Sequence, residues 1–354
     1  MIVYLIVASI PFLVGEWFFC NVKRTGKLYK LKKLLCLLLA ALPMFLLIGF
    51  RNQYIGADTI NYLNHFTQIS QTPWGEIFEG TRMEYGYIVF VKLISLFTKS
   101  PLVYQVICAM IYWVAISVFA NQLEDSSFLF FYFFATLGIY TFMYTGVRQC
   151  IAMCICLLSY VFIRKRKIIP FILLVILAYF FHKSSILFVA TYFIYNRKIT
   201  WYNMLIYGGI SAFSVYYLEN IQQFFNDALD YDYTIENAGG GTIFLVLIAG
   251  LTLMSILIIF SYNKLTKQGQ GLFNIGVIAV FFWILRYFTR VAERPSFFFL
   301  FFSCALLAHA LDLIPKAKER FFTKCAVCAV TLALYVYRFS SNFSTYVPWQ
   351  SYSF

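Results

Sequence analysis

Apolar residues occur along this chain in long runs that are separated by short polar segments. A helix needs about 20 apolar residues to cross the hydrocarbon core of a bilayer. Backbone N–H and C=O groups find no water there, so runs of this length indicate helices. They predict an all-α, polytopic membrane helix bundle with spans near residues 2–20, 33–50, 102–120, 128–146, 148–163, 168–181, 184–195, 203–218, 242–262, 271–290, 296–313 and 323–339.

A few of the runs depart from this simple pattern. Residues 86–98 are apolar, but a crossing there would place Arg164–Lys167 outside the cell, so we predict a re-entrant or interfacial helix. The runs 168–181 and 184–195 are short for a bilayer and predict a thin or tilted hairpin around His182. The opening run has no basic segment before it and is interpreted as a retained span. About 12 spans then form a single membrane domain, residues 1–354.

Composition supports the membrane assignment. The chain is 62% hydrophobic and 12% charged, with a mean hydropathy of +0.76, which excludes an ordinary soluble domain. The cysteines lie mostly in apolar runs, including Cys325 and Cys328, as is typical of packing residues. We therefore expect no metal ion and no cofactor.

The distribution of charge predicts which side each loop faces. Most of the 28 Lys and Arg residues lie in five runs, which the positive-inside rule assigns to the cytoplasm: Lys23–Lys33, Arg164–Lys167, Arg197–Lys198, Lys264 with Lys267, and Lys316–Lys324. The outer side receives loops near 51–85 and 219–241 and both termini. Topology thus accounts for the net charge of +13, and no nucleic-acid partner is expected.

Several basic residues remain after topology, and most of them fall at the predicted outer ends of spans: Arg51, Arg82, Lys92, Lys99, Arg148, Lys183, Arg286, Arg290, Arg294 and Arg338. Arginine near the membrane is costly and is usually functional or paired.

Three of these arginines share one spacing. Arg286, Arg290 and Arg294 follow each other at i, i+4 and i+8, so on one helix they would share a face with Glu293. Arginine forks match phosphate oxygens, which predicts an anion clamp; the alternative is an interfacial cluster tied to Glu293. Arg148 opens a span, where a helix N-terminus favours anions; alternatively it is an interfacial helix-end residue.

The segment 51–66 is polar and of mixed charge. We interpret Arg51, Asn52 and Thr59 as part of a hydrated outer rim, with Asp58 and Thr59 alternatively capping a helix.

Two further titratable residues border apolar runs. Glu84 is either a helix cap or an acid–base group, and His182 is either structural or a proton acceptor near neutral pH. His65 is interpreted as a hydrated loop residue and His309 as a packed helix residue, and neither receives a role.

Taken in order, several stretches resemble the EpsG family of polysaccharide polymerases, which is related in function to the Wzy-type polymerases of O-antigen, capsule and exopolysaccharide. The stretches are RNQYIGADTINYLNHF (51–66), EYGY (84–87), GVRQCIA (146–152), FHKSS (181–185), RVAERPSFFFLFF (290–302) and YVPWQSY (346–352).

The resemblance implies a metal-independent membrane glycosyltransferase in the bacterial cytoplasmic membrane. It would join oligosaccharide repeat units carried on undecaprenyl pyrophosphate, at the outer face, and could work beside export and chain-length proteins. Such a reaction needs cations for the leaving pyrophosphate and a base for the acceptor hydroxyl. We assign the first role to Arg148, Arg286, Arg290 and Arg294. For the second, His182 stands narrowly ahead of Glu84 and Asp58, and activity should then fall below about pH 6 to 6.5.

Three other functions compete with this one. A flippase for the same lipid-linked oligosaccharide also needs arginines, but it should line a cavity through the membrane midplane. A glycan ligase or acyl-transferring enzyme could use His182. A structural scaffold leaves the arginines unexplained.

The predicted topology is tested by single cysteines labelled from outside the cell. Label should reach positions in 52–80 and 225–238 and should miss positions in 24–30 and 316–322, because only the first two ranges lie outside. External labelling at residue 27 would overturn the placement of every candidate residue.

Overall fold

The computed structural model describes residues 2–21, 28–123, 126–220, 223 and 241–341. Most of the predicted acidic outer loop, part of the first basic run and the terminal stretch 346–352 lie outside these residues. The described part is helical and contains no strand. Its helices are α1 (Ile2–Asn21), α2 (Tyr29–Gly49), α3 (Thr59–Gln71), α4 (Tyr85–Phe97), α5 (Pro101–Gln122), α6 (Ser127–Thr136), α7 (Ile139–Phe142), α8 (Val147–Arg164), α9 (Ile168–Tyr179), α10 (Ala190–Ile194), α11 (Trp201–Tyr216), α13 (Thr242–Ser261), α14 (Lys267–Phe288), α15 (Glu293–Asp312) and α16 (Ala317–Ser341). Two 3₁₀ segments are η1 (Lys183–Val189) and η2 (Arg290–Ala292).

The described helices include seven that are long and apolar enough to cross a membrane: α2, α5, α8, α13, α14, α15 and α16. The predicted hairpin around His182 consists of α9, η1 and α10, which are all shorter. Helix α4 has 13 residues, a length of about 20 Å at 1.5 Å per residue, so it falls short of the hydrocarbon thickness. These elements are those of a polytopic helix bundle. Among the described residues, several of the predicted spans are shorter helices.

One predicted span is broken. Residues 128–146 form two helices, because α6 ends at Thr136 and α7 begins at Ile139. Between them Gly138 has a φ of +89°, a left-handed conformation that only glycine adopts without strain. The apolar run did not indicate this break, because a pattern of hydrophobic residues carries no information on local backbone dihedral angles.

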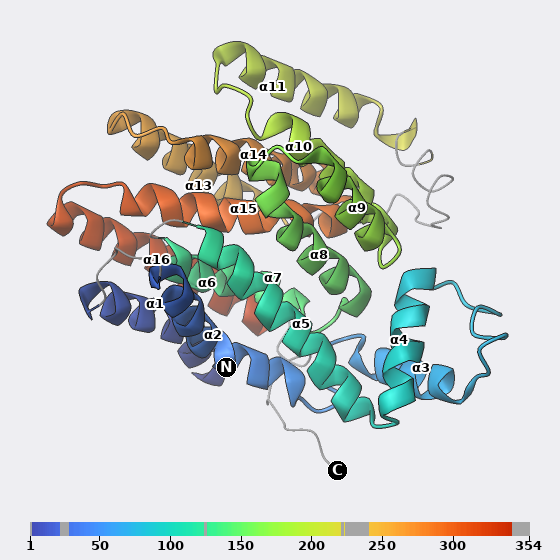
Figure 1. The fold of residues 1–354 in the computed structure, drawn as a ribbon. Coiled ribbons are helices and arrows are strands. Elements are labelled where there is room, and N and C mark those ends of the chain that lie inside the picture. The colour runs from blue at the N-terminus through green and yellow to red at the C-terminus, as the bar shows by residue number, and fades with distance from the viewer. Residues whose placement is uncertain (1, 22–27, 124–125, 221–222, 224–240, 342–354) are drawn as a thin grey trace.

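The polar segment 51–66 contains the start of a helix, which the sequence analysis gave only as the alternative to a hydrated rim. Helix α3 buries Tyr62, Phe66 and Ile69, which are spaced four and three residues apart, and it leaves Asn61 and Asn64 exposed. With α4 it forms a hairpin at one end of the bundle (Figure 1). The side chains of Lys92 and Lys99 donate hydrogen bonds to the carbonyls of Ile69 and Ser70, at 3.1 and 2.7 Å. These lysines therefore satisfy the C-terminal end of α3.

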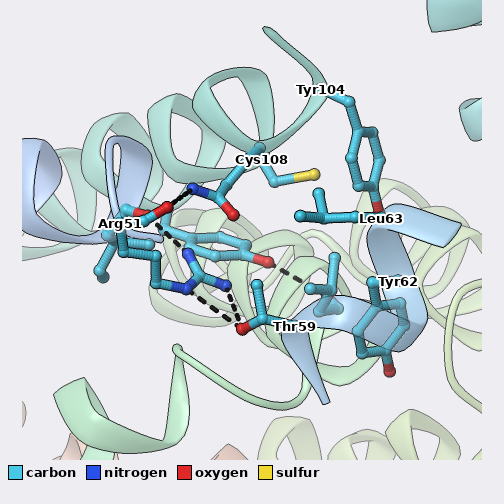
Figure 2. Close-up of a pocket in the computed structure, with 10 residues that line it drawn as sticks. Arg51, Thr59, Tyr62, Leu63, Tyr104 and Cys108 are labelled. Atoms are coloured by element: carbon cyan, nitrogen blue, oxygen red, sulfur yellow. Dashed lines mark hydrogen bonds between the residues drawn. The ribbon is translucent and has the colours of Figure 1, made fainter. Parts of the chain in front are cut away.

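The expected hydrated rim is wrong for three of its residues, since Arg51, Asn52 and Thr59 are all buried. The Arg51 guanidinium donates to the carbonyls of Ile48 and Tyr144, at 2.5 and 3.2 Å, and to the Thr59 hydroxyl (Figure 2). It thus joins the end of α2 to the beginning of α3.

The Asp58 carboxylate, seven residues after Arg51, is half-buried. It makes no hydrogen bond or ion pair with the described part of the chain. The alternative interpretation placed Asp58 and Thr59 at the start of a helix. It is correct in position, because Asp58 immediately precedes α3. The Asp58 side chain nevertheless forms no capping hydrogen bond.

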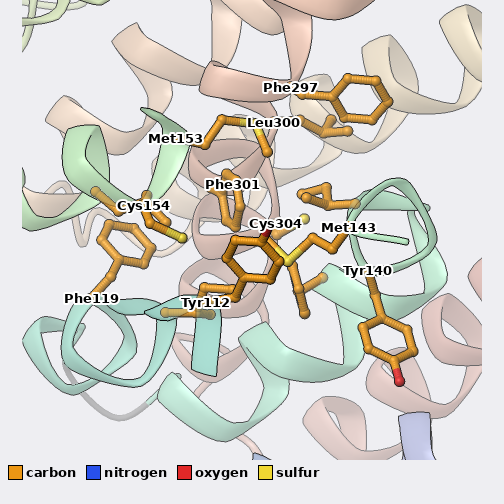
Figure 3. Packing of buried hydrophobic residues seen from close by; sticks show 14 of the residues in the cluster. Tyr112, Phe119, Tyr140, Met143, Met153, Cys154, Phe297, Leu300, Phe301 and Cys304 are labelled. Atoms are coloured by element: carbon orange, nitrogen blue, oxygen red, sulfur yellow. The ribbon is translucent and has the colours of Figure 1, made fainter. Parts of the chain in front are cut away.

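The core lies around α15, which is buried along almost its whole length. Its phenylalanines stack on aromatic rings from other helices: the Phe297 and Phe142 centroids are 4.1 Å apart, and those of Phe301 and Phe134 are 5.7 Å apart. Figure 3 shows Phe297, Phe301 and Cys304 of α15 within this core. Such close ring contacts add specific geometry to the general apolar packing.

The two ends of the bundle carry different sets of charged residues. At one end Arg164 and Gln268 both donate to the Gln122 carbonyl, and Lys264 donates to that of Leu313. This end carries the basic segments that topology assigned to the cytoplasm. At the opposite end of the same helices lie Arg51, Glu84, Arg148 and Arg294.

A close approach fixes the α3–α4 hairpin to the bundle. A Cβ placed on Gly86, in the first turn of α4, would lie 2.6 Å from the Phe180 Cβ and 2.7 Å from the Phe180 carbonyl oxygen. Only glycine fits there, so α4 begins directly against the turn that leads into His182.

We predict that Gly86→Ala destabilises the protein by about 1 to 3 kcal/mol, because the added methyl group overpacks this contact. The matched control is Gly208→Ala in α11, where a Cβ meets nothing within 4 Å. It should be neutral or slightly stabilising, because alanine favours helix. Thermal unfolding in detergent measures both variants, and equal midpoints would refute the close approach.

Candidate functional site

An ion pair joins Arg148 and Glu84 at the end of the bundle opposite Arg164 and Lys264. Arg148 is the second residue of α8 and Glu84 immediately precedes α4, so the pair joins a long membrane helix to the α3–α4 hairpin. The Glu84 side chain is 6% exposed and that of Arg148 is 23% exposed. The Arg148 Nε also donates to the Tyr62 hydroxyl of α3, at 3.5 Å. The Arg148 guanidinium thus links α8 to α3 and to the start of α4, and it remains partly accessible.

Two helix N-termini meet beside this pair. The Gln149 amide donates to the Arg294 carbonyl at 2.5 Å, which ties the first turn of α8 to the first turn of α15. The positive ends of the two helix dipoles, together with the side chains of Arg148 and Arg294, contribute positive charge to this region. Pro295 is compatible with the first turn of α15, because a missing N–H costs no helical hydrogen bond there.

The predicted stripe of three arginines on one helix face is wrong. Helix α14 ends at Phe288, Thr289 is extended, and α15 begins only at Glu293, so Arg286 and Arg294 belong to different helices. The Arg286 Nε bonds the Glu293 carboxylate at 2.7 Å, which confirms the pairing of that acid. Arg294 is exposed, whereas the Arg290 side chain lies outside the described part of the structure.

His182 follows α9 and is buried. Its Nδ1 is 2.7 Å from the Ser184 hydroxyl, within the FHKSS stretch. Burial, followed by the nearby guanidiniums of Arg148 and Arg294, lowers the pKa of His182 to about 3. The imidazole is therefore neutral near pH 7, as proposed for a base. The expected loss of activity below pH 6 to 6.5 cannot come from protonation of this residue.

The candidate bases thus differ in how they are engaged. Glu84 is bonded to Arg148, so its lone pairs are partly occupied. His182 has a low proton affinity, and a base works best when its pKa is near the operating pH. Asp58 is unengaged by the described residues and lies one helical turn before Tyr62.

Sequence reasoning missed three residues of this region: Tyr62, Gln149 and His65. His65 is not a loop residue, because it lies within α3 and its ring stacks on Tyr87 at 5.7 Å. The available signal was spacing, since Tyr62 and His65, like Glu84 and Tyr87, are three residues apart and share a face once both segments are helices. His309 is packed in α15 as predicted, with its Nε2 3.3 Å from the Thr266 hydroxyl.

A small pocket lies behind Tyr62, between α3 and α5. Arg51, Thr59, Tyr104, Gln105 and Cys108 line it (Figure 2). Among the described residues no cluster of three or more His, Cys, Asp or Glu side chains is placed to hold a metal ion.

Comparison with known proteins identifies the family. The model of the EpsG family matches residues 34–354, which is most of the chain, so the chain belongs to the EpsG family. This is the family of Wzy-like polysaccharide polymerases, and a function of the polysaccharide-polymerase type follows. No curated protein and no solved structure matches the chain.

The lowered pKa of His182 predicts how stability depends on pH. An unfolded histidine, with a pKa of 6.5, binds a proton below that pH, whereas the folded one stays neutral down to about 3. Stability is therefore complete above pH 6.5 and decreases as the pH falls, by about 2 kcal/mol at pH 5. Thermal unfolding in detergent at pH 7 and pH 5 should show a smaller decrease for His182→Gln than for the wild type. Equal decreases would argue against burial of a neutral imidazole.

Proposed function

We propose that this protein joins oligosaccharide repeat units carried on undecaprenyl pyrophosphate, at the outer face of the bacterial cytoplasmic membrane. The observation that carries the proposal is the meeting of Arg148 and Arg294 with the N-termini of α8 and α15, beside Glu84 and His182. A polysaccharide polymerase with a pyrophosphate leaving group needs such a concentration of positive charge.

The reaction is a glycosyl transfer. A hydroxyl oxygen of the acceptor sugar attacks the anomeric carbon of the donor, and the bond from that carbon to the pyrophosphate oxygen breaks. Negative charge develops on the pyrophosphate, which Arg148, Arg294 and the positive dipole ends of the two helices would stabilise. Arginine suits this role because its planar fork can bind two phosphate oxygens at once.

The remaining residues have different parts in the proposal. Glu84 holds the Arg148 side chain in place, and in a site this well paired it acts through Arg148 rather than as a free base. Neutral His182 would offer a hydrogen bond to the substrate between the two arginines. Arg286 is bound to Glu293, so its charge is already balanced, and its contribution would be to shape the α14–α15 turn.

The side of the membrane follows from charge. The end of the bundle opposite Arg148 carries Arg164, Lys264 and Lys324, which the positive-inside rule places in the cytoplasm. Lipid-linked repeat units would then be joined on the outer side, with the lipid chains remaining in the bilayer between or against the helices.

A flippase for the same lipid-linked oligosaccharide is the second candidate. It requires cations along a path through the midplane. The two arginines proposed to bind the pyrophosphate, Arg148 and Arg294, instead lie at one end of their helices. This arrangement favours a polymerase.

The test uses purified protein in detergent and the lipid-linked repeat unit isolated from cells that lack this gene. A ladder of longer glycans, formed with no other protein present, supports the proposal. Transfer across a vesicle membrane without any ladder would instead support the flippase.

We predict that Arg148→Ala and Arg294→Ala each lower the rate of ladder formation by about 100-fold or more, as loss of a charge-stabilising donor does in other enzymes. Arg148→Lys should be nearly as impaired, because lysine keeps the charge but loses the fork. The control is Arg164→Ala at the other end of α8, whose guanidinium donates to the Gln122 carbonyl and lies over the Tyr160 ring, and it should keep the wild-type rate. Wild-type rates in both Arg148→Ala and Arg294→Ala would refute the pyrophosphate role.

A further inference from the structure

His65 has an unusual environment for a histidine on a surface helix. Both ring nitrogens are covered by neighbouring atoms, and neither makes a hydrogen bond with any group in the described part of the chain. A buried polar atom left without a partner costs about 1 to 3 kcal/mol. Such atoms are few in folded proteins and each needs a reason. Here the reason would be a substrate group that forms a hydrogen bond with one of the His65 nitrogens.

The surroundings hold the His65 ring in place. Its plane lies at 22° to that of Tyr87, with 5.7 Å between the ring centroids. The Tyr87 hydroxyl is in turn bonded to the Tyr104 hydroxyl at 2.8 Å. The next residue of α3, Phe66, stacks on Tyr104 at 4.8 Å. The plane of the ring is therefore supported by aromatic side chains whose hydroxyl groups, those of Tyr87 and Tyr104, bond each other rather than the imidazole nitrogens.

His65 also faces the proposed site. Tyr62, one turn earlier on α3, bonds Arg148, and Glu84, one turn before Tyr87 on α4, is ion-paired with the same arginine. The Arg148 charge acts directly on the imidazole and, after burial, helps to lower the pKa of His65. A neutral imidazole has a nitrogen lone pair that can accept a hydrogen bond from a hydroxyl group. The nearby guanidinium disfavours its protonation.

We propose that His65 is the group that takes the proton from the acceptor hydroxyl in the glycosyl transfer. As the hydroxyl oxygen forms its bond to the donor's anomeric carbon, its proton passes to an imidazole nitrogen of His65. The bond from that carbon to the pyrophosphate oxygen breaks, and its electron pair leaves with the lipid pyrophosphate. The imidazolium returns its proton to water before the next cycle. The assignment rests on the proposed polymerase function and adds the residue that activates the acceptor.

Geometry favours His65 over the other candidate bases. The Glu84 carboxylate is occupied by Arg148, and the His182 Nδ1 is engaged by Ser184, whereas His65 has both nitrogens unengaged by the described residues. Access for a hydroxyl needs only rotation about the Cβ–Cγ bond, for which histidine has broad wells. His65 as a whole residue is partly exposed, so it borders the surface of the protein.

The experiment compares ladder formation by the wild type, His65→Phe, His65→Ala and Asn64→Ala, all purified in detergent with the lipid-linked repeat unit isolated from cells lacking this gene. His65→Phe keeps a ring against Tyr87 and removes both nitrogens, so it should fold but lose about 100-fold or more of the rate. Asn64, which is exposed at the preceding position of the same helix, serves as the control and should keep the wild-type rate. Retention of the repeat unit by immobilised protein should be alike in all four.

Chemical rescue separates a proton acceptor from a packing residue. His65→Ala opens a space beside Tyr87, and free imidazole added to the assay should restore part of its rate while leaving His65→Phe inactive. A wild-type rate in His65→Phe, or an inactive His65→Ala that imidazole does not rescue, overturns the assignment. A wild type that forms no ladder would refute the proposed function itself, and that outcome is distinct from both.

Discussion

The ion pair between Glu84 and Arg148 holds together the region on which the proposed chemistry depends. It joins the α3–α4 hairpin to the first turn of α8, and the Glu84 side chain is almost fully removed from solvent. A buried pair of this kind is weak evidence of stability, because desolvation offsets the attraction. Removal of one partner is nevertheless severe, since it leaves a buried charge uncompensated at a cost of about 3 to 5 kcal/mol. The pair therefore fixes geometry more than it adds stability.

Five of the basic residues left over from topology divide into two groups by their position on the helices. Arg51, Lys92 and Lys99 donate to backbone carbonyls at the ends of helices, so their charges balance helix dipoles and close the loops around α3. Arg148 and Arg294 instead lie at helix starts, where a positive side chain reinforces the dipole rather than balancing it. An arrangement that is unfavourable for the protein alone is favourable for an anionic ligand, which explains why the second group, and not the first, carries the proposed pyrophosphate site.

Two close approaches place the parts of this region with respect to one another. The contact of Gly86 with Phe180 sets the beginning of α4 against the turn before His182, and the bond from Gln149 to the Arg294 carbonyl sets α8 against α15. Residues from positions 62 to 294 of the chain are thereby gathered at one end of the bundle. The opposite end, with Arg164 and Lys264, is closed by bonds to carbonyls that terminate helices.

From the sequence alone the class of the protein and the position of most helices could be predicted, and Arg148, Glu84 and His182 could be named as candidate residues. These follow from apolar length and charge, which act locally and are readable in one dimension. Tertiary structure decided the rest. An extended Thr289 separates Arg286 from Arg294, and Gly138 divides an apolar run that reads as one span. Whether a polar residue is hydrated, as expected of Arg51, or buried, and whether His65 lies in a loop or against Tyr87, depends on which distant helices pack around it, and no local pattern encodes those contacts.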